Sequence, residues 1–197
     1  MNTINFYNQK SAQLIQRYDN ANMSTLHNLL LKYIPNGSTI LDIGFGSGRD
    51  LEFLSNNDYN IWGIDPSFKF VENAKKRFPD IKNQFIQSSV PFEKKSIKLN
   101  MSFNAVISIA MWMHLQHNQY QSVVENIVSL TKAHSTIIIS FSKGNRNNDK
   151  RYFEDVNLEY ITKLFFNKGF FLVDTIKNND SLDRETLTWI TVIYQND

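Results

Sequence analysis

Cysteine is absent from this chain of 197 residues, which excludes disulfides, zinc–thiolate sites, iron–sulfur clusters and a cysteine nucleophile. The chain also has no apolar run of the roughly 18 residues that a membrane-spanning helix needs. Its polar N-terminus carries no signal-peptide pattern. Glycine (7) and proline (4) are scarce, which excludes collagen-like and proline-rich architectures. We therefore expect a cytoplasmic protein with no membrane partner.

Neither sign of charge predominates: the chain has 21 Lys and Arg and 19 Asp and Glu, for a net charge of +2. The basic residues are scattered and form no stripe of the kind that marks nucleic-acid binders. Nucleic acid is therefore not expected as a partner, and a small molecule is the better candidate. The apolar share of 42% is ordinary for a globular domain that buries a core. The composition leaves the oligomeric state open.

Along the chain, segments with strand-like patterns alternate with segments of helical periodicity. Short apolar runs that predict strands cover 39–43, 60–64, 83–86, 103–109, 136–141, 170–176 and 186–194, and helical spacing covers 5–18, 24–34, 50–57, 68–78, 119–131 and 158–168. Continuously apolar strands are typical of a parallel sheet that is covered on both faces. The last two strands have no helix between them. The pattern predicts an α/β, doubly wound, mostly parallel seven-stranded sheet with an antiparallel C-terminal hairpin strand.

Two polar or helical segments lie outside that repeating pattern. Residues 1–35 are predicted to form an N-terminal helical cap on a domain that covers 36–197. Residues 142–151 show neither periodicity, and we expect them to form a loop that orders when ligand binds.

A glycine-rich turn follows the first predicted strand. Gly44, Gly46 and Gly48 allow a tight turn and a close approach of the backbone to a ligand. A dinucleotide fingerprint, GxGxxG, would need a third glycine where this chain has Arg49. Asp42 precedes the turn and suits the ammonium group of an amino-acid moiety better than a pyrophosphate. A lone glycine loop can equally be a structural turn.

A second carboxylate strengthens the functional interpretation. Asp65 ends the second predicted strand, 17 residues after Gly48 (65 − 48). This is close to the spacing of about 20 residues at which a carboxylate meets ribose hydroxyls. The two carboxylates at strand ends, on either side of the glycine turn, predict a nucleoside-binding site.

The string LDIGFGSGRDLEFL, followed by GIDPS, resembles the first two motifs of class I S-adenosylmethionine-dependent methyltransferases. The chain is most similar to small bacterial members with GSGRD, WMH and R-x-x-x-x-W motifs, here Gly46–Asp50, Trp112–His114 and Arg184–Trp189. The resemblance covers about residues 36–194. It implies that 36–197 is a Rossmann-like methyltransferase domain. The cofactor is then S-adenosylmethionine, the product is S-adenosylhomocysteine, and the acceptor is small and unidentified.

The resemblance also implies which residues hold the cofactor. These are Asp42, Gly44, Gly46, Gly48, Asp65, Pro66, Ser88, Ser89, Ile109, Ala110 and Met111. Outside the resemblance, Tyr7 in the N-terminal helix is a further candidate that could close over the cofactor, and packing on the helix face is the structural alternative for it. Ser88 stands where the family commonly has an acidic residue near the adenine. Lys132–Ser135 replaces the usual Pro-Gly-Gly turn. Neither departure touches the methyl-transfer centre, and no metal is expected.

Methyl transfer from a sulfonium is an in-line displacement with a neutral leaving group, so holding the acceptor close and aligned supplies much of the acceleration. A general base is needed only if the acceptor must lose a proton. His114 is the candidate base, because its usual pKa is near 6.5; a histidine bonded to backbone is the structural alternative. Arg49, Arg151 and Arg184 are candidates for binding an anionic acceptor. Arg151 and Arg184 could also be solvated charges, whereas Arg49 is a cation at a helix N-terminus and is expected to have a ligand or a carboxylate partner.

Two other functions remain open on the sequence. A non-catalytic S-adenosylmethionine-binding sensor or partner subunit would bind cofactor without turnover. A nicotinamide-dependent oxidoreductase is disfavoured by Arg49. Methylation of a flipped DNA base is disfavoured because Ala110–Met113 lacks the Asn/Asp-Pro-Pro-aromatic segment of such enzymes.

Overall fold

The computed structural model describes residues 3–93, 99, 101–144, 146, 149–179 and 187–197. Its strands are β1 (Thr39–Ile43), β2 (Asn60–Asp65), β3 (Phe85–Gln87), β4 (Phe103–Ile109), β5 (Thr131–Gly144), β6 (Phe171–Asn179) and β7 (Leu187–Gln195). Its α-helices are α1 (Thr3–Asp19), α2 (Ser24–Tyr33), α3 (Arg49–Ser55), α4 (Phe68–Arg77), α5 (Tyr120–Val128) and α6 (Leu158–Phe166). Short 3-10 helices cover Pro79–Gln84, Trp112–His114 and His117–Gln119.

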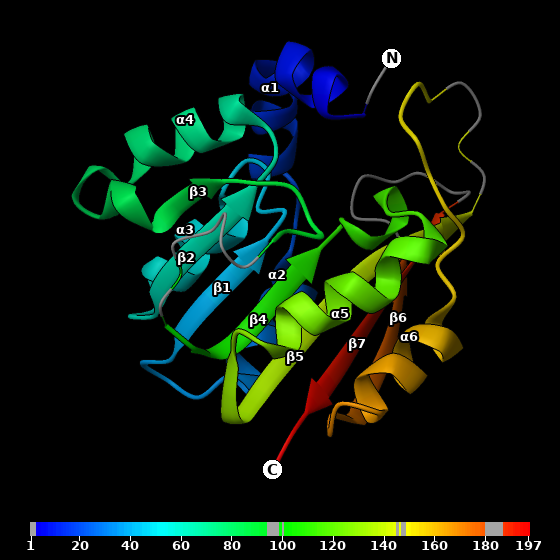
Figure 1. Ribbon diagram of the computed structural model, residues 1–197. Helices are drawn as coiled ribbons and strands as arrows, with labels where there is room; N and C mark the ends of the chain where they lie inside the picture. The colour runs from blue at the N-terminus through cyan, green and yellow to red at the C-terminus, as the bar shows by residue number, and fades with distance from the viewer. Residues whose placement is uncertain (1–2, 94–98, 100, 145, 147–148, 180–186) are drawn as a thin grey trace.

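The seven strands form one sheet in the order β3-β2-β1-β4-β5-β7-β6 (Figure 1). The pairs β1–β2, β1–β4, β2–β3 and β4–β5 are parallel. Strand β7 runs antiparallel to both β5 and β6. The fold class is confirmed, including the reversed strand in the C-terminal hairpin.

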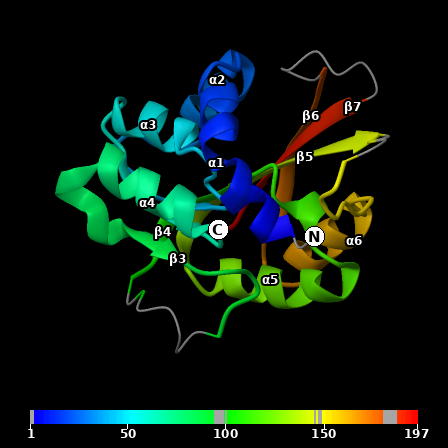
Figure 2. The same ribbon diagram turned by 90° about the horizontal axis from the view of Figure 1, so that it is seen from above.

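Alternating side chains of the strands divide the core into two layers. Ile40 of β1 packs with α1 to α4, whereas the adjacent Leu41 packs with α5 and α6. Figure 2 shows α2, α3 and α4 on one side of the sheet and α5 and α6 on the other. Because both faces are covered, the central strands are apolar on both, as a parallel sheet requires.

Helix α1 lies beyond the ends of β1 and β2 rather than flat on a sheet face (Figure 1). Ser67 Oγ donates to Asn8 Oδ1 over 2.7 Å, and Arg77 pairs with Asp19 at the other end of the helix. Leu14 of α1 is buried in the same core as Leu30 of α2. These contacts place α1 directly above the carboxyl edge of the sheet.

One part of the sequence-based assignment is wrong. Residues 142–144 were expected to begin an irregular loop, but Ser142, Lys143 and Gly144 continue β5 and pair with β7. Strand β5 also begins at Thr131, five residues earlier than the β-branched run at 136. The neighbouring strands supply backbone hydrogen bonds whatever the polarity of the side chains, so pairing extends β5 beyond its apolar centre.

Candidate functional site

A cavity of about 650 Å³ opens at the carboxyl edge of the sheet, beneath α1. The residues predicted from the sequence that line it are Tyr7, Asp42, Gly44, Gly46, Arg49, Asp65, Pro66, Ser88, Ser89, Ile109, Ala110, Met111, His114 and Arg151. Gly48 is not among its lining residues, and Arg184 lies outside the described residues. The fold therefore gathers nearly all the described candidates around one space.

The glycine turn forms one wall of this cavity. Gly44 has a φ of +81°, and a Cβ at this position would lie 3.0 Å from the side chain of Met111. Gly46 has a φ of +57°, and a Cβ there would meet no protein atom within 4 Å. A bare backbone that faces open space is suited to a ligand that packs directly against it.

Asp65 lies at the end of β2, across from the glycine turn. It accepts hydrogen bonds from the backbone N–H of Gly46 over 2.9 Å and from that of Ser67 over 2.8 Å. Burial raises the pKa of Asp65 to about 6, against these two hydrogen bonds. A carboxylate has about four acceptor positions, so Asp65 retains positions for two hydroxyl donors from a ligand.

Asp42 lies at the end of β1 and is 1% exposed. Its Oδ1 atom is buried and has no hydrogen-bond partner among the described residues. Burial, and then the nearby Asp50 and Asp65, raise the pKa of Asp42 well above its usual value. A buried carboxyl oxygen without a partner fits a cationic ligand group that would supply both the hydrogen bond and the charge.

Arg49 makes contacts that explain a cation at the start of α3. Its Nε donates to Oδ1 of Asp50 over 3.0 Å, and its Nη2 donates to Oδ2 over 2.8 Å. Its Nη1 donates to the carbonyl of Tyr18 over 3.3 Å. His27 also bonds Asp50, and although burial opposes ionisation, Arg49 and His27 lower the pKa of Asp50 to about 2. The guanidinium therefore ties α3 to α1.

The adenine-side candidates follow β3. The backbone N–H of Ser88 donates to the carbonyl of Asp65 over 3.1 Å, and its hydroxyl donates to the carbonyl of Ser89 over 3.2 Å. On the opposite wall, Ala110 has a φ of +63° and its N–H donates to the carbonyl of Ser140. Ser88, Ser89 and Ala110 all line the cavity.

His114 is held at both ring nitrogens. Nδ1 lies 2.7 Å from the carbonyl of Tyr152, which can only accept, so Nδ1 carries the proton. Nε2 lies 2.8 Å from the hydroxyl of Tyr7, which in turn accepts from Nη1 of Arg151 over 2.8 Å. The Tyr7 hydroxyl therefore donates to Nε2. Burial lowers the pKa of His114 to about 4, and the charges of Arg151 and Arg146 act in the same direction.

Of the far wall of the cavity, the sequence singled out only Arg151 and, within the R-x-x-x-x-W motif, Trp189. We call this wall the arginine half: Ser140, Ser142, Arg146, Arg151, Phe153 and Trp189, all of which line the cavity. The opposite wall, with Asp42, Asp50, Asp65 and the glycine turn, is the carboxylate half. A further signal was available for the far wall, since Ser140 and Ser142 interrupt an apolar strand at alternate positions, on the same face.

The described residues contain no helix that could cross a membrane. The same part of the chain contains no group of three His, Asp or Glu side chains placed to hold a metal ion.

Comparisons with known proteins agree with this geometry. The family model described as "Methyltransferase domain" matches residues 40–134. A ubiquinone biosynthesis O-methyltransferase of Salmonella paratyphi A is 28% identical over 130 residues, which is 65% of this chain. The chain spans about half (51%) of the length of that relative.

Solved structures show the same fold at low identity. One is the 1,6-didemethyltoxoflavin-N1-methyltransferase of Burkholderia thailandensis, with bound 1,6-didemethyltoxoflavin and S-adenosylhomocysteine. It has a TM-score of 0.77 and 14% identity, covering 98% of this chain and 87% of the other. Another is the magnesium protoporphyrin IX methyltransferase of Synechocystis with bound S-adenosylhomocysteine, with a TM-score of 0.71 and 15% identity, covering 98% and 97%.

Proposed function

We propose that the chain is a class I S-adenosylmethionine-dependent methyltransferase and that it transfers a methyl group to a small acceptor bound in the arginine half of the cavity. The observation that carries this proposal is the convergence of Asp42, Asp65 and the bare Gly46 backbone on a cavity that extends to Arg146 and Arg151. One wall suits a cationic nucleoside, and the other suits an acceptor beside it.

The residues of the carboxylate half fit S-adenosylmethionine. The unpartnered Oδ1 of Asp42 would take its ammonium group, and Asp65 would take its ribose hydroxyls. The bare backbone of Gly46 would pack against S-adenosylmethionine, while Ser88 and Ser89 would border its adenine. A carboxylate that accepts from both ribose hydroxyls specifies an unphosphorylated nucleoside.

When bound, S-adenosylmethionine supplies a methyl group on a sulfonium, which an acceptor lone pair can attack in line. The chain's own contribution is to position the two and to exclude water. Tyr7 joins α1 to His114 and Arg151 above the cavity, which supports a role for residues 1–35 as a cap over the domain at 36–197.

His114 acts in this proposal as a positioning residue and not as a general base. Its Nε2 lone pair already accepts the Tyr7 proton, and its Nδ1 proton is bound to the Tyr152 carbonyl. Arg151 is bound at two of its nitrogens by Asp149. Among the described residues of the arginine half, no base therefore has a free lone pair, which favours an acceptor that reaches the site already deprotonated or uncharged with a lone pair.

The names of the similar proteins support a small acceptor. One is an O-methyltransferase of ubiquinone biosynthesis, and another has 1,6-didemethyltoxoflavin bound. Both are named for small-molecule substrates.

Calorimetric titration with S-adenosylmethionine, S-adenosylhomocysteine and NADH tests the proposal. We expect the first two to bind at a single site and NADH to show no binding, because Arg49 occupies the third-glycine position of a dinucleotide loop. NADH binding more tightly than S-adenosylhomocysteine, or no binding by either sulfur compound, would reject it.

A further inference from the structure

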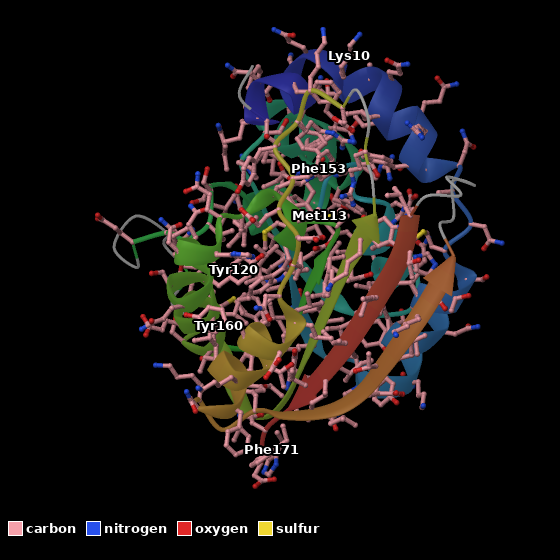
Figure 3. The ribbon with its side chains drawn as sticks, turned by 90° about the vertical axis from the view of Figure 1, so that its right-hand side faces the viewer. Lys10, Met113, Tyr120, Phe153, Tyr160 and Phe171 are labelled. Carbon is pink, nitrogen blue, oxygen red and sulfur yellow. The ribbon has the colours of Figure 1, made fainter. Side chains whose placement is uncertain are left out.

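A pair of buried hydroxyl groups lies in the floor of the arginine half. Ser140 of β5 and Thr191 of β7 are 4% and 3% exposed, and both line the cavity. The two residues are register partners in the sheet, and Oγ1 of Thr191 donates to Oγ of Ser140 over 3.0 Å. Figure 3 shows β5 and β7 side by side, with α1, which carries Lys10, above them. The pair is therefore fixed on two paired strands and not on a loop.

The mutual hydrogen bond leaves the pair with unused donor and acceptor capacity. Two hydroxyls have two protons and four lone pairs between them, and the bond between Ser140 and Thr191 uses one of each. No other hydrogen bond joins either hydroxyl to a residue that the structure describes. Whichever hydroxyl donates within the pair, the other still has a proton to donate to a ligand, and the first can still accept. The pair therefore presents one donor and one acceptor side by side.

The hydroxyl pair lies on the same face of the sheet as Asp42. The residues two positions before Asp42 and Ser140 and two positions after Thr191 all belong to the core layer that packs against α1 to α4, and side chains two positions apart on a strand share a face. In the order β1-β4-β5-β7, Ser140 is two strands from β1 and Thr191 is three. With neighbouring strands about 4.8 Å apart, these separations across the sheet are roughly 10 and 14 Å. The pair therefore lies beside the place proposed for the cofactor's ammonium group and not in it.

Apolar side chains flank the pair on both sides. Ile109 of β4 is the register partner of Ser140, and Ile176 of β6 is that of Thr191. A ligand group that packs against the pair excludes water from it and has to satisfy both hydroxyls itself, since a buried polar group without a partner is unfavourable. The pair therefore selects for a ligand group that carries an acceptor next to a donor.

An amide whose N–H and C=O point to the same side matches this arrangement, and we call that group a cis amide edge. Open-chain secondary amides are almost always trans, so the edge occurs in cyclic amides (lactams) and in primary amides. A carboxylic acid has the same two groups, but it is ionised near pH 7 and then has no proton to donate. A lactam is neutral at this pH and keeps both its donor and its acceptor.

We propose that Ser140 and Thr191 form a subsite for a cis amide edge, and that the methyl acceptor is a lactam anchored there by that edge. The inference rests on the proposed function, because it names the recognition group of the acceptor in the same cavity. The edge is the anchor and not the reacting atom, so the nucleophile is another atom of the same molecule. A neutral anchor also suits a half of the cavity in which Arg151 is already paired with Asp149.

The test uses three pyridones and the protein saturated with S-adenosylhomocysteine. 2-Pyridone has its N–H beside its C=O, 4-pyridone has the same two groups on opposite sides of the ring, and N-methyl-2-pyridone lacks the N–H. Ligand-observed NMR titrations measure the three dissociation constants. We expect 2-pyridone to bind with a millimolar dissociation constant and each of the other two to bind about tenfold more weakly.

A variant and its matched control locate this preference. Thr191→Val keeps the branched shape of the side chain and leaves a single hydroxyl, which cannot serve both groups of the edge. It should weaken 2-pyridone binding about tenfold and leave 4-pyridone nearly unchanged, so that the preference is lost. A loss of packing alone would weaken both pyridones equally. Thr188→Val is the control, because Thr188 is exposed on the same strand and does not line the cavity, and it should keep the preference.

Three results would overturn the inference: no binding of 2-pyridone, equal binding of 2-pyridone and 4-pyridone, or equal effects of the two variants. The wild-type comparison of the two isomers decides the question even if Thr191→Val does not fold. Failure of S-adenosylhomocysteine to bind in the first step would instead reject the proposed function. The two failures are therefore distinguishable.

Discussion

The carboxylate half and the arginine half of the cavity differ in how far apart their residues lie in the sequence. In the carboxylate half, Asp42, the glycine turn and Asp65 belong to one continuous β1–α3–β2 stretch, and a backbone N–H of the turn holds Asp65 directly. Beside the arginine half, Tyr7 bonds His114 and Arg151, which lie 107 and 144 residues away in the sequence. The first half is local and held by backbone. The second is held by side chains from segments that meet only after folding.

Of the variants considered, Asp65→Ala should have the largest effect, which is a loss of cofactor affinity in the carboxylate half. We expect Asp65→Ala to weaken S-adenosylhomocysteine binding by about 1–3 kcal/mol, the loss expected for hydrogen bonds to a charged group. Calorimetry measures the affinity. Asp149→Ala removes a carboxylate from behind the other half, and it should change the same affinity by less than about 0.5 kcal/mol if the halves are independent. Equal losses in the two variants would contradict that independence.

Tyr7→Phe should destabilise the folded protein by removing the long-range contacts of Tyr7 beside the arginine half. It leaves Nε2 of the half-buried His114 and one Arg151 donor without the Tyr7 hydroxyl, so the free energy of unfolding should fall by about 1 kcal/mol. Urea denaturation measures this. Tyr160→Phe is the control, since Tyr160 is an exposed tyrosine on α6 that does not line the cavity. A loss as large in the control would show that the Tyr7–His114 contact is not the cause.

The two halves should also respond oppositely to pH. Burial raises the pKa of Asp65 from 3.8 to about 6 and lowers the pKa of His114 from 6.5 to about 4. The folded state therefore binds more protons than the unfolded state at Asp65 and fewer at His114. The stability that Asp65 contributes is present below about pH 4 and is lost as pH rises to 6, whereas that of His114 is present above 6.5 and is lost as pH falls to 4.

These opposing slopes partly cancel in the native protein between pH 4 and 6, and single variants separate them. Asp65→Asn should make stability rise more steeply with pH across this window. His114→Gln should make stability fall as pH rises, because the remaining slope is then set by Asp65 and by Asp42, whose pKa values are both raised by burial. Urea midpoints at several pH values measure both slopes. Unchanged slopes in both variants would show that neither group has the shifted pKa.

The same contrast explains what could be predicted from the sequence. The strand–glycine–helix stretch predicted Asp42, Gly44, Gly46 and Asp65 because neighbouring residues fix that turn. The hydrogen bond between His114 and Tyr7 could not be predicted, since Tyr7 lies on another element. The end of β5 was missed because its partner β7 determines the pairing of Ser142. Arg184 is outside the described residues, and its acceptor-side role stays a prediction.

A crystal structure with S-adenosylhomocysteine bound tests the division of the cavity most directly. We predict the ribose hydroxyls at Asp65, the amino group at Asp42 and the sulfur atom facing Arg146 and Arg151, with the arginine half left open for an acceptor. The opposite orientation, with the adenine between Phe153 and Trp189 and the amino group away from Asp42, would contradict it.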